Sequence, residues 1–389
     1  MPDPPINSDD PYPLLDWICE RIRERGPVTV AQFMEWALYH EQLGYYSRGP
    51  QIGPRGDFTT SPEASTAFGR LLANHLFDID ALLGHPAHFH VIECGPGLGT
   101  LAKDLLDELS SSRPDVYART RYWLVEISPG LTAAQQTLLS PEHGGVARWA
   151  RSLDEMPEGV DGALLANEVV DAFPVHVLEN RGGLIMEHYV EAAPGAELRI
   201  GYGPPSRPEL MTFLDKYGID LKPGQRLEVN LAARRWVGQV RRALGRGLAT
   251  IIDYGDTSPT RYSEARREGT LLGYYGGAVT DNILARPGGQ DLTALVDFTA
   301  LQDAAAEEGL STVALTRQAN FLLGLGLGTA VTAESVGGDL AAVLRNRRGL
   351  QALISPEGLG RFHVLVLSHG LDPDTARAGL SGLMYAEVS

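Results

Sequence analysis

Three glycines at alternate positions follow a short apolar run in residues 91–99, VIECGPGLG. The run predicts a buried strand, and the leucine spacing of residues 100–109 predicts an amphipathic helix directly after it. Glycines between the two let the backbone turn sharply and approach a ligand closely, and the first turn of the helix offers free N–H groups. The loop therefore predicts a ligand site, with a tight turn in some other α/β protein as the alternative. The loop residues assigned to the site are Gly95, Pro96, Gly97, Gly99 and Thr100.

The spacing of these glycines indicates the class of ligand. The dinucleotide fingerprint is G-x-G-x-x-G, whereas the third glycine here comes one residue earlier. The pattern acid-x-Gly-x-Gly-x-Gly resembles the S-adenosylmethionine (SAM) loop of Rossmann-like methyltransferases.

The ends of the next two predicted strands carry further candidates for binding this ligand. Glu126 closes the run RYWLVE and precedes Ile127, and a carboxylate at that position can accept hydrogen bonds from both ribose hydroxyls. Ser152, Leu153 and Asp154 follow the third strand. There the leucine could pack on an adenine ring while the acid accepts from its amino group. An ordinary helix cap is the alternative for this stretch.

The stretch LLANEVVDAFPVHVLE (164–179) is the candidate for the methyl-acceptor side. Asn167 and Glu168 end an apolar strand, and polar residues at the carboxyl end of a central strand lie where open α/β sheets bind ligands. Asp171 follows three residues later, and His176 is a candidate base. We expect Asn167, Glu168 and Asp171 to face the acceptor, with Asn167 also touching the cofactor. A solvated strand-to-helix turn is the alternative.

Two further polar clusters lie upstream. The loop GDFTTSPE (56–63) supplies Asp57, Thr60, Ser61 and Pro62, which could hold the amino-acid part of SAM. His85, His88 and His90 have a spacing compatible with zinc, but no cysteine or carboxylate adjoins them and the segment enters a strand. We predict no metal site.

Composition narrows the class of protein and of partner. The formal charge of −16 over 389 residues argues against binding to nucleic acid or to an anionic membrane, because both favour a basic surface. The two cysteines, Cys19 and Cys94, are too few for a disulfide framework, which predicts a reducing, cytoplasmic location. The N-terminus does not resemble a signal peptide, and no apolar run reaches the ~18 residues that a membrane span needs.

The order of the elements predicts an α/β fold with a mostly parallel sheet and helices on both faces. Strands are expected at 89–94, 121–126, 146–150, 162–167, 248–253, 311–316 and 362–367, and helices at 14–26, 30–40, 61–83, 100–109, 130–139, 230–244 and 298–308. The predicted organisation is a disordered lead (1–13), a helical N-terminal cap (14–85), a SAM-binding core (86–173 and 230–389) and substrate-side insertions (174–229 and 255–297). The N-terminal helices are compatible with a homodimer.

Several motifs together resemble the MidA-type family of SAM-dependent methyltransferases, which includes the mitochondrial complex I assembly arginine methyltransferase. They run in order from about residue 28 to 368, and the more specific ones are GDFTTSPE (56–63), ECGPGLG (93–99), NEVVDAFP (167–174) and IIDYG (251–255). The resemblance implies a Rossmann-like class I methyltransferase core, a helical cap and a mixed α/β substrate insertion. It also implies that Gly95, Gly97, Gly99 and Glu126 hold SAM, which leaves as S-adenosylhomocysteine.

Three departures from the family pattern fall mainly on the acceptor side. Leu98 stands where a large polar or basic residue is expected, Leu295 stands where members tend to have histidine, and the segment YYGGAVTDN (274–282) lacks a histidine. The acceptor is therefore left open between a protein arginine and a small-molecule biosynthetic intermediate methylated on O, N or C. The rivals from other classes are a non-catalytic assembly or scaffold protein that retains SAM, and a nucleotide-dependent oxidoreductase.

Overall fold

The central feature of the computed structural model is a seven-stranded sheet in the order β16-β17-β10-β5-β2-β3-β4. The structure describes residues 13–49, 60–329 and 348–387. Strands β10, β5, β2, β3 and β4 are parallel, and β17 runs antiparallel to both of its neighbours. The strands are β2 (Phe89–Cys94), β3 (Thr120–Val125), β4 (Ala147–Ala150), β5 (Val160–Asn167), β10 (Leu244–Asp253), β16 (Ser311–Arg317) and β17 (His363–His369). The α/β fold with a mostly parallel sheet is confirmed.

Both faces of this sheet are buried, as its unbroken apolar strands require. Alternate residues of β2 point to opposite faces: Val91 packs in one apolar cluster and Ile92 in the other. One face is covered by α4 (Ala67–Leu82), α5 (Thr100–Ser112), α12 (Gln318–Gly324) and α15 (Pro373–Gly379), with α6 (Pro114–Arg119) and α7 (Pro129–His143) beside α5. The other face is covered by α9 (Leu231–Ala243), α11 (Phe298–Glu307) and the 3-10 turn η1 (Leu153–Glu155).

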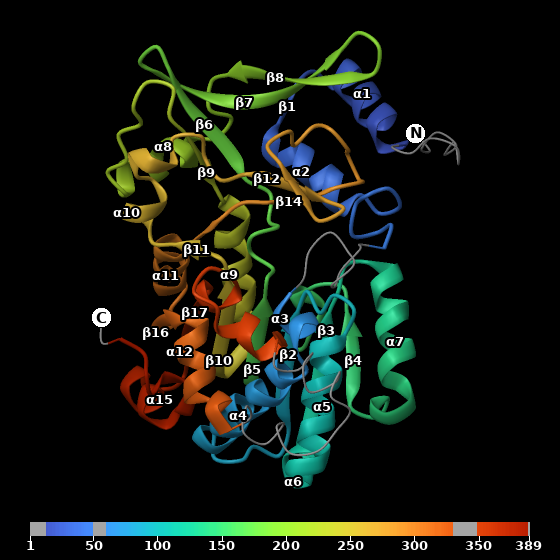
Figure 1. Ribbon diagram of the computed structural model, residues 1–389, viewed down its shortest axis with the longest axis vertical. Helices are drawn as coiled ribbons and strands as arrows, with labels where there is room; N and C mark the ends of the chain where they lie inside the picture. The colour runs from blue at the N-terminus through green and yellow to red at the C-terminus, as the bar shows by residue number, and fades with distance from the viewer. Residues whose placement is uncertain (1–12, 50–59, 330–347, 388–389) are drawn as a thin grey trace.

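A second sheet lies beyond the carboxyl ends of the parallel strands, at the top of Figure 1. It is antiparallel and consists of β1 (Val28–Thr29), β6 (His176–Arg181), β7 (Leu184–Ala193), β8 (Glu197–Gly203) and β9 (Arg226–Val229), with α8 (Pro208–Lys216) packed beside it. The predicted insertion 174–229 therefore contains β6, β7, β8 and β9, and neither these strands nor α8 were among the predicted elements.

Residues 255–297 cross between the two sheets (Figure 1). They form a small antiparallel sheet of β12 (Leu272–Tyr275), β13 (Ala278–Thr280) and β14 (Asp291–Thr293), and a parallel pair of β11 (Gly255–Asp256) and β15 (Val296–Asp297). The segment also contains the helical turns α10 (Ser258–Arg261) and η2 (Glu264–Arg266), whereas the 3-10 turns η3 (Leu359–Arg361) and η4 (Ser381–Leu383) lie near the C-terminus. Because its strands are so short, this segment shows no periodicity that sequence alone could detect.

The predicted N-terminal cap is divided between two packing units. Helices α1 (Pro13–Arg25) and α2 (Val30–Tyr39) pack in one apolar cluster with Val175, Val177 and Val190 of the insertion, and β1 pairs with β7. Helix α4 instead packs on the central sheet and α5. The single helix expected over 61–83 is broken at Ser65, which adopts an extended conformation between α3 (Ser61–Ala64) and α4. The predicted boundary between the cap and the SAM-binding core, at residue 85, therefore does not match the way these helices pack.

Both cysteines, Cys19 and Cys94, are buried and free. Burial raises the pKa of the Cys94 thiol to about 12, so it has no nucleophilic character at neutral pH. Within the three described ranges, no helix is both long and apolar enough to cross a membrane.

Candidate functional site

A large cavity of about 890 Å³ lies where strands β2, β3, β4 and β5 end. In chain order the sheet grows from β2 to β3 and β4 on one side, and from β2 to β5 and β10 on the other. The reversal next to β2 is the topological switch point, where open α/β sheets bind their ligands. The volume falls in the range of pockets for small molecules and cofactors.

The glycine loop forms one wall of this cavity. Gly95, Gly97 and Gly99 have φ of 62°, 54° and 83°, a left-handed region that costs a residue with a side chain about 1–2 kcal/mol. A Cβ on Gly95 would also come within 2.9 Å of Val169 Cγ2. Gly99 is the N-cap of α5, so the first turn of that helix begins at the loop, as the sequence predicts.

Glu126 lies directly after β3, on the cavity wall. Its Oε1 accepts a hydrogen bond from the backbone N–H of Ser128 at 2.8 Å, and its Oε2 accepts one from Gln135 Nε2 at 3.3 Å. Burial raises the pKa of Glu126 to about 7, although these two hydrogen bonds act to lower it. Ile127, next to it, also lines the cavity and is half exposed.

Gln135 is a residue that sequence reasoning missed. Its Nε2 also donates to the carbonyl of Gly97 at 2.7 Å, and its Oε1 accepts from Trp149 Nε1 at 3.2 Å. One buried side chain thus connects the glycine loop, Glu126 and β4. Its place four residues after Leu131, on the buried stripe of α7, was the only signal that the sequence offered.

Of the three site residues predicted after β4, two belong to the cavity wall. Ser152 and Leu153 line the cavity, and Leu153 is buried. Asp154 is not among the lining residues. Its carboxylate accepts from Gln239 Nε2 at 2.8 Å and from Arg242 Nη2 at 2.9 Å. This pairing with α9 is at odds with the prediction that Asp154 meets a ligand.

Asn167 and Glu168 both line the cavity at the end of β5. Glu168 has φ of 53°, which is rare for a residue with a side chain and often marks a functional position. Its Oε1 accepts from the backbone N–H of Ser61 and from Asn167 Nδ2, both at 3.0 Å. Burial raises the pKa of Glu168 to about 8. Oδ1 of Asn167 is buried without a hydrogen-bond partner among the described residues.

The turn after Glu168 is held by Asp253 at the end of β10. Its Oδ2 accepts hydrogen bonds from the backbone N–H groups of Val169, Val170 and Asp171, at 3.2, 2.9 and 3.2 Å. Its Oδ1 accepts from the N–H of Tyr254 at 2.8 Å. Asp253 is fully buried, so water could not take the place of its carboxylate as the acceptor for these N–H groups. The apolar stretch IIDYG did not reveal this role.

Two predicted catalytic residues lie away from the cavity. The carboxylate of Asp171 is buried, accepts from Tyr254 OH at 2.5 Å, and is not part of the cavity wall. Burial raises its pKa to about 6. His176 lies in β6, and its Nδ1 bonds to Oε1 of the buried Glu187 at 2.7 Å. The strand carries this imidazole into the second sheet, a displacement that sequence distance from Glu168 could not predict.

The upstream loop reaches the cavity through its last residues. Thr60, Pro62 and Glu63 line it, and Thr100 Oγ1 donates to Glu63 Oε1 at 2.6 Å. Ser61 is buried behind them, with its Oγ donating to Gln318 Oε1 at 3.2 Å, so it does not meet the cavity as predicted. Asp57 lies outside the described residues.

Part of the remaining wall is aromatic, and the sequence analysis assigned none of these aromatic side chains to the site. Tyr39 and Tyr46 of the cap lie with ring centroids 5.5 Å apart. Tyr39 OH donates to the carbonyl of Ala172 at 3.0 Å. Phe173 and Trp236 form an edge-on pair at 5.7 Å on the side of α9. The tyrosines of ALYHEQLGYYS (37–47) were visible in the sequence, but nothing in their spacing indicated the cavity.

The three histidines do not converge on one point. His85 Nδ1 bonds to Asp80 at 2.7 Å, and His90 Nδ1 accepts from Trp123 Nε1 at 3.2 Å. In the described ranges the one group with metal-ligand spacing is Asp107, Glu142 and His143, and Lys103 Nζ already bonds to both of its carboxylates.

Comparisons with known proteins identify the family. A family model of S-adenosyl-L-methionine-dependent methyltransferases matches residues 71–316. The chain belongs to this family. The Drosophila melanogaster homolog of the mitochondrial protein arginine methyltransferase NDUFAF7 is 31% identical over 74% of this chain and 69% of its own length. The Mus musculus protein of that name is 29% identical over 93% and 86%. A Burkholderia thailandensis crystal structure with bound S-adenosyl-homocysteine has a TM-score of 0.86 and 29% identity, covering 100% of this chain and 99% of that one.

These comparisons confirm the MidA-type resemblance, the class I methyltransferase fold and SAM as cofactor. This methyltransferase is therefore an enzyme of that class, and neither the scaffold nor the oxidoreductase interpretation is favoured. The predicted cytoplasmic location is wrong, because the curated relatives are mitochondrial proteins. Two reduced cysteines reflect only redox conditions and could not separate one compartment from the other.

Proposed function

We propose that this enzyme methylates a guanidinium nitrogen of an arginine in a protein, with Asn167 and Glu168 holding the acceptor. The observation that carries the proposal is a pair of acceptor atoms at one point of the cavity wall. Asn167 Oδ1 is buried and unpartnered among the described residues, and Oε2 of Glu168 beside it makes no hydrogen bond to them. A guanidinium group has five N–H donors and no acceptor, which suits such a pair.

The described residues fit SAM in the remainder of the cavity. Its sulfonium supplies an electrophilic methyl group. In our assignment Glu126 accepts hydrogen bonds from the ribose, Ser152 and Leu153 contact the adenine, and the loop from Gly95 to Gly99 approaches the amino-acid part. The cavity wall carries six glutamates against three arginines, Arg151, Arg235 and Arg242, so its formal charge is negative, which favours a cation. The close approach of Gly95 to Val169 leaves no room for a side chain at position 95.

Glu168 then has two tasks. Its carboxylate orients the guanidinium and localises the positive charge on the nitrogens that it contacts. As the N–C bond forms and the S–C bond breaks, the attacking nitrogen loses a proton, which the carboxylate can accept. Tyr39, Tyr46, Phe173 and Trp236 add aromatic faces, which attract cations. Alignment of the two reactants supplies the greater part of the rate.

The departures from the family pattern give little support to a small-molecule acceptor. Leu98 lines the cavity, but neither Leu295 nor any residue of 274–282 is among its described wall residues. The curated relatives named above are protein arginine methyltransferases, which favours the same acceptor here.

The test uses methyl-labelled SAM, the purified enzyme and a lysate of the host lacking its gene. The lysate is separated into macromolecules and small metabolites, and labelled protein is hydrolysed to amino acids. We expect the label in a protein band and in methylarginine. Label in the small-metabolite pool, or in another amino acid of a protein, would contradict the proposal.

A further inference from the structure

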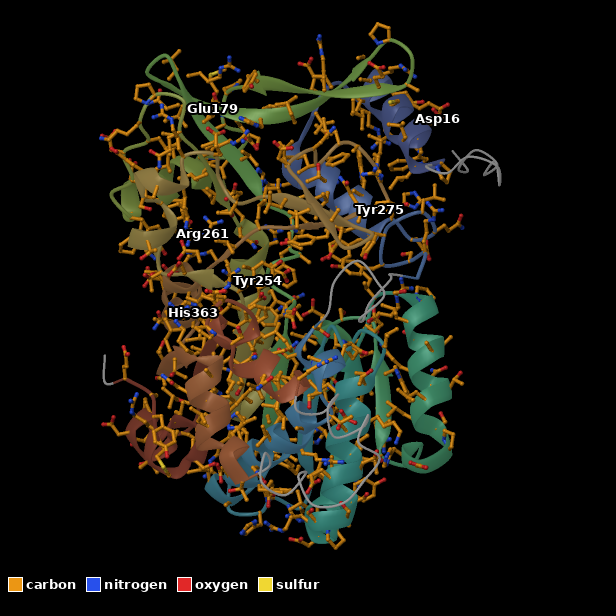
Figure 2. The ribbon with its side chains drawn as sticks, viewed as in Figure 1. Asp16, Glu179, Tyr254, Arg261, Tyr275 and His363 are labelled. Atoms are coloured by element: carbon orange, nitrogen blue, oxygen red, sulfur yellow. The ribbon has the colours of Figure 1, made fainter. Side chains whose placement is uncertain are left out.

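A second cavity, of about 480 Å³, lies at the same edge of the central sheet, where β10 and β16 end. We call it the arginine cavity. Its wall includes Arg266, Arg317, Arg361, Asp256, Tyr254 and Leu295. Figure 2 labels Tyr254 and His363 on this side of the molecule, just below the crossing segment that carries β12 and β14.

The charge of this cavity is opposite to that of the chain. Three guanidinium groups share the wall with one carboxylate, in a protein of net charge −16. Arg266 Nη2 bonds to Asp256 Oδ2 at 2.8 Å, which leaves Nη1 of Arg266 buried without a partner in the described ranges. Arg317 Nη1 donates to the carbonyl of Arg361 at 2.7 Å. The guanidinium of Arg361 makes no hydrogen bond or ion pair with another described residue.

A nearby titratable group reflects this positive charge. His363 Nδ1 lies 3.2 Å from Arg317 Nη1. Burial and the charge of Arg317 lower the pKa of His363 to about 4, although the charge of Asp256 has a smaller effect that raises it. This histidine is therefore neutral at physiological pH and adds no positive charge of its own, so the three arginines account for the cationic character of the wall.

Two short chains of contacts connect the wall of the arginine cavity with the acceptor residues. Arg317 precedes Gln318, whose Oε1 accepts from Ser61 Oγ, and the N–H of Ser61 donates to Glu168. On the other side, Tyr254 lines the arginine cavity and donates its hydroxyl hydrogen to Asp171, three residues after Glu168. An extended chain advances about 3.3 Å per residue, so a few residues of an acceptor chain would span the two sites.

We infer that the arginine cavity binds a carboxylate side chain of the acceptor protein, a few residues from the arginine that is methylated. This inference rests on the proposed function. Arginine forks bind carboxylates through paired, charge-assisted hydrogen bonds, and Arg266 and Arg361 have donors available. The two cavities then present opposite charges, the acidic one to the target guanidinium and the basic one to its acidic neighbour. Leu295 adds an apolar side chain to the wall of the arginine cavity.

The probes are two short synthetic peptides with one central arginine, one flanked by glutamates and the other by glutamines. Binding to the SAH-loaded enzyme is measured by fluorescence anisotropy, and methyl transfer from labelled SAM is measured in parallel. We expect the acidic peptide to bind about tenfold more tightly, and the difference to shrink with added salt. Arg361→Gln and Arg266→Gln should each reduce the preference for the acidic peptide while leaving the affinity for the neutral peptide unchanged.

Arg246→Gln is the matched control, because it removes the same charge from an exposed arginine at the opposite end of β10. Equal binding of both peptides, or an equal loss of preference in Arg246→Gln, would overturn the inference. The inference would also be overturned if inorganic phosphate displaced the acidic peptide no more than it displaced the neutral one. Methylation of both peptides at equal rates would support the proposed function but would reject the arginine cavity as a binding site for the acceptor. Acid-dependent binding with no methylarginine formed would support the site and reject the proposed acceptor.

Discussion

The backbone N–H of Ser61 donates a hydrogen bond to Oε1 of Glu168 at 3.0 Å, across 107 positions of the sequence. This bond joins the loop before α4 to the end of β5. Thr60 and Pro62, on either side of Ser61, line the cavity. The side chain that we propose to hold the acceptor therefore also fixes part of the wall around the cofactor.

Replacement of Glu168 should separate these two tasks. Glu168→Gln retains an oxygen for Ser61 but removes the charge, and we expect turnover to fall about 10²- to 10³-fold with little change in SAM affinity. Glu168→Ala also loses the contact with Ser61, and turnover should become undetectable while SAM affinity stays within a few-fold. Labelled methyl transfer and calorimetric SAM titration measure the two effects. Glu41→Gln, an exposed change in the cap, is the control. Normal turnover in Glu168→Gln would remove this residue from the catalytic assignment.

The raised pKa of Glu168, about 8, predicts how activity depends on pH. The guanidinium needs the ionised carboxylate, so turnover at limiting acceptor should rise with pH until Glu168 is deprotonated, near pH 8. A bound cation lowers that pKa, so acceptor binding at neutral pH should release a proton. The pH–rate profile of the wild type and of Glu168→Gln tests this. A profile in the variant that keeps the same rise would assign it to another group.

The same pKa predicts how stability depends on pH. A carboxyl whose pKa is raised by folding binds its proton more tightly in the folded state, so the folded state loses stability as pH rises from the ordinary glutamate value through about 8. Glu93 and Glu126, whose pKa values burial raises to about 7, act in the same direction. We expect chemical unfolding to show a less stable ligand-free protein at pH 8 than at pH 6, with a smaller difference in Glu168→Gln. An unchanged difference would show that Glu168 titrates normally.

Asp253 should act as a positioning residue rather than a catalytic one. Asp253→Ala leaves four backbone N–H groups without an acceptor, and we expect it to lower the free energy of unfolding by about 3 kcal/mol. Asp253→Asn keeps one oxygen for those donors but presents an amide to the N–H of Tyr254, so its loss should be smaller. Both should lower kcat more than they raise the KM for SAM. Asp281→Asn, at an exposed position, provides the control for unfolding and kinetics. An Asp253→Ala protein as stable as the control would show that the turn does not depend on this carboxylate.

Glu126 should contribute more than Gln135 to the affinity for the cofactor. Glu126→Ala removes the proposed contacts to the ribose, and we expect it to weaken SAM binding about 10- to 100-fold. Gln135→Ala removes only the support of Glu126 and of the Gly97 carbonyl, so a loss of several-fold is expected. Isothermal titration with S-adenosylhomocysteine measures both. Equal affinity in Glu126→Ala and the wild type would place the ribose elsewhere.

Gly95→Ala tests the glycine loop directly. The new Cβ would lie 2.9 Å from Val169 Cγ2 at a φ of 62°, and we expect a loss of about 2 kcal/mol of stability together with weaker SAM binding. Gly145→Ala adds a Cβ that meets nothing within 4 Å and should change neither quantity. Thermal unfolding with and without S-adenosylhomocysteine distinguishes the two. Identical curves for both variants would mean that the loop adapts.

The sequence by itself determined the sheet, the glycine loop and the family, because these depend on local patterns. Strand and helix periods, the turn chemistry of Gly95 to Gly99 and the strand-ending position of Glu126 are all encoded within short stretches. It also led to Asn167 and Glu168, whose place at the end of a central strand follows from the order of the elements.

Only the tertiary structure decided which of the nearby polar residues meet the cavity. Asp171 and His176 lie close to Glu168 in the sequence, yet a turn held by Asp253 buries one and β6 carries the other into a second sheet. Asp154 is paired with Arg242 across η1 and α9. Tyr39, Gln135 and Asp253 act through partners more than 35 positions away. Such contacts depend on how whole elements pack, and no local pattern records which distant residue a buried polar side chain will find.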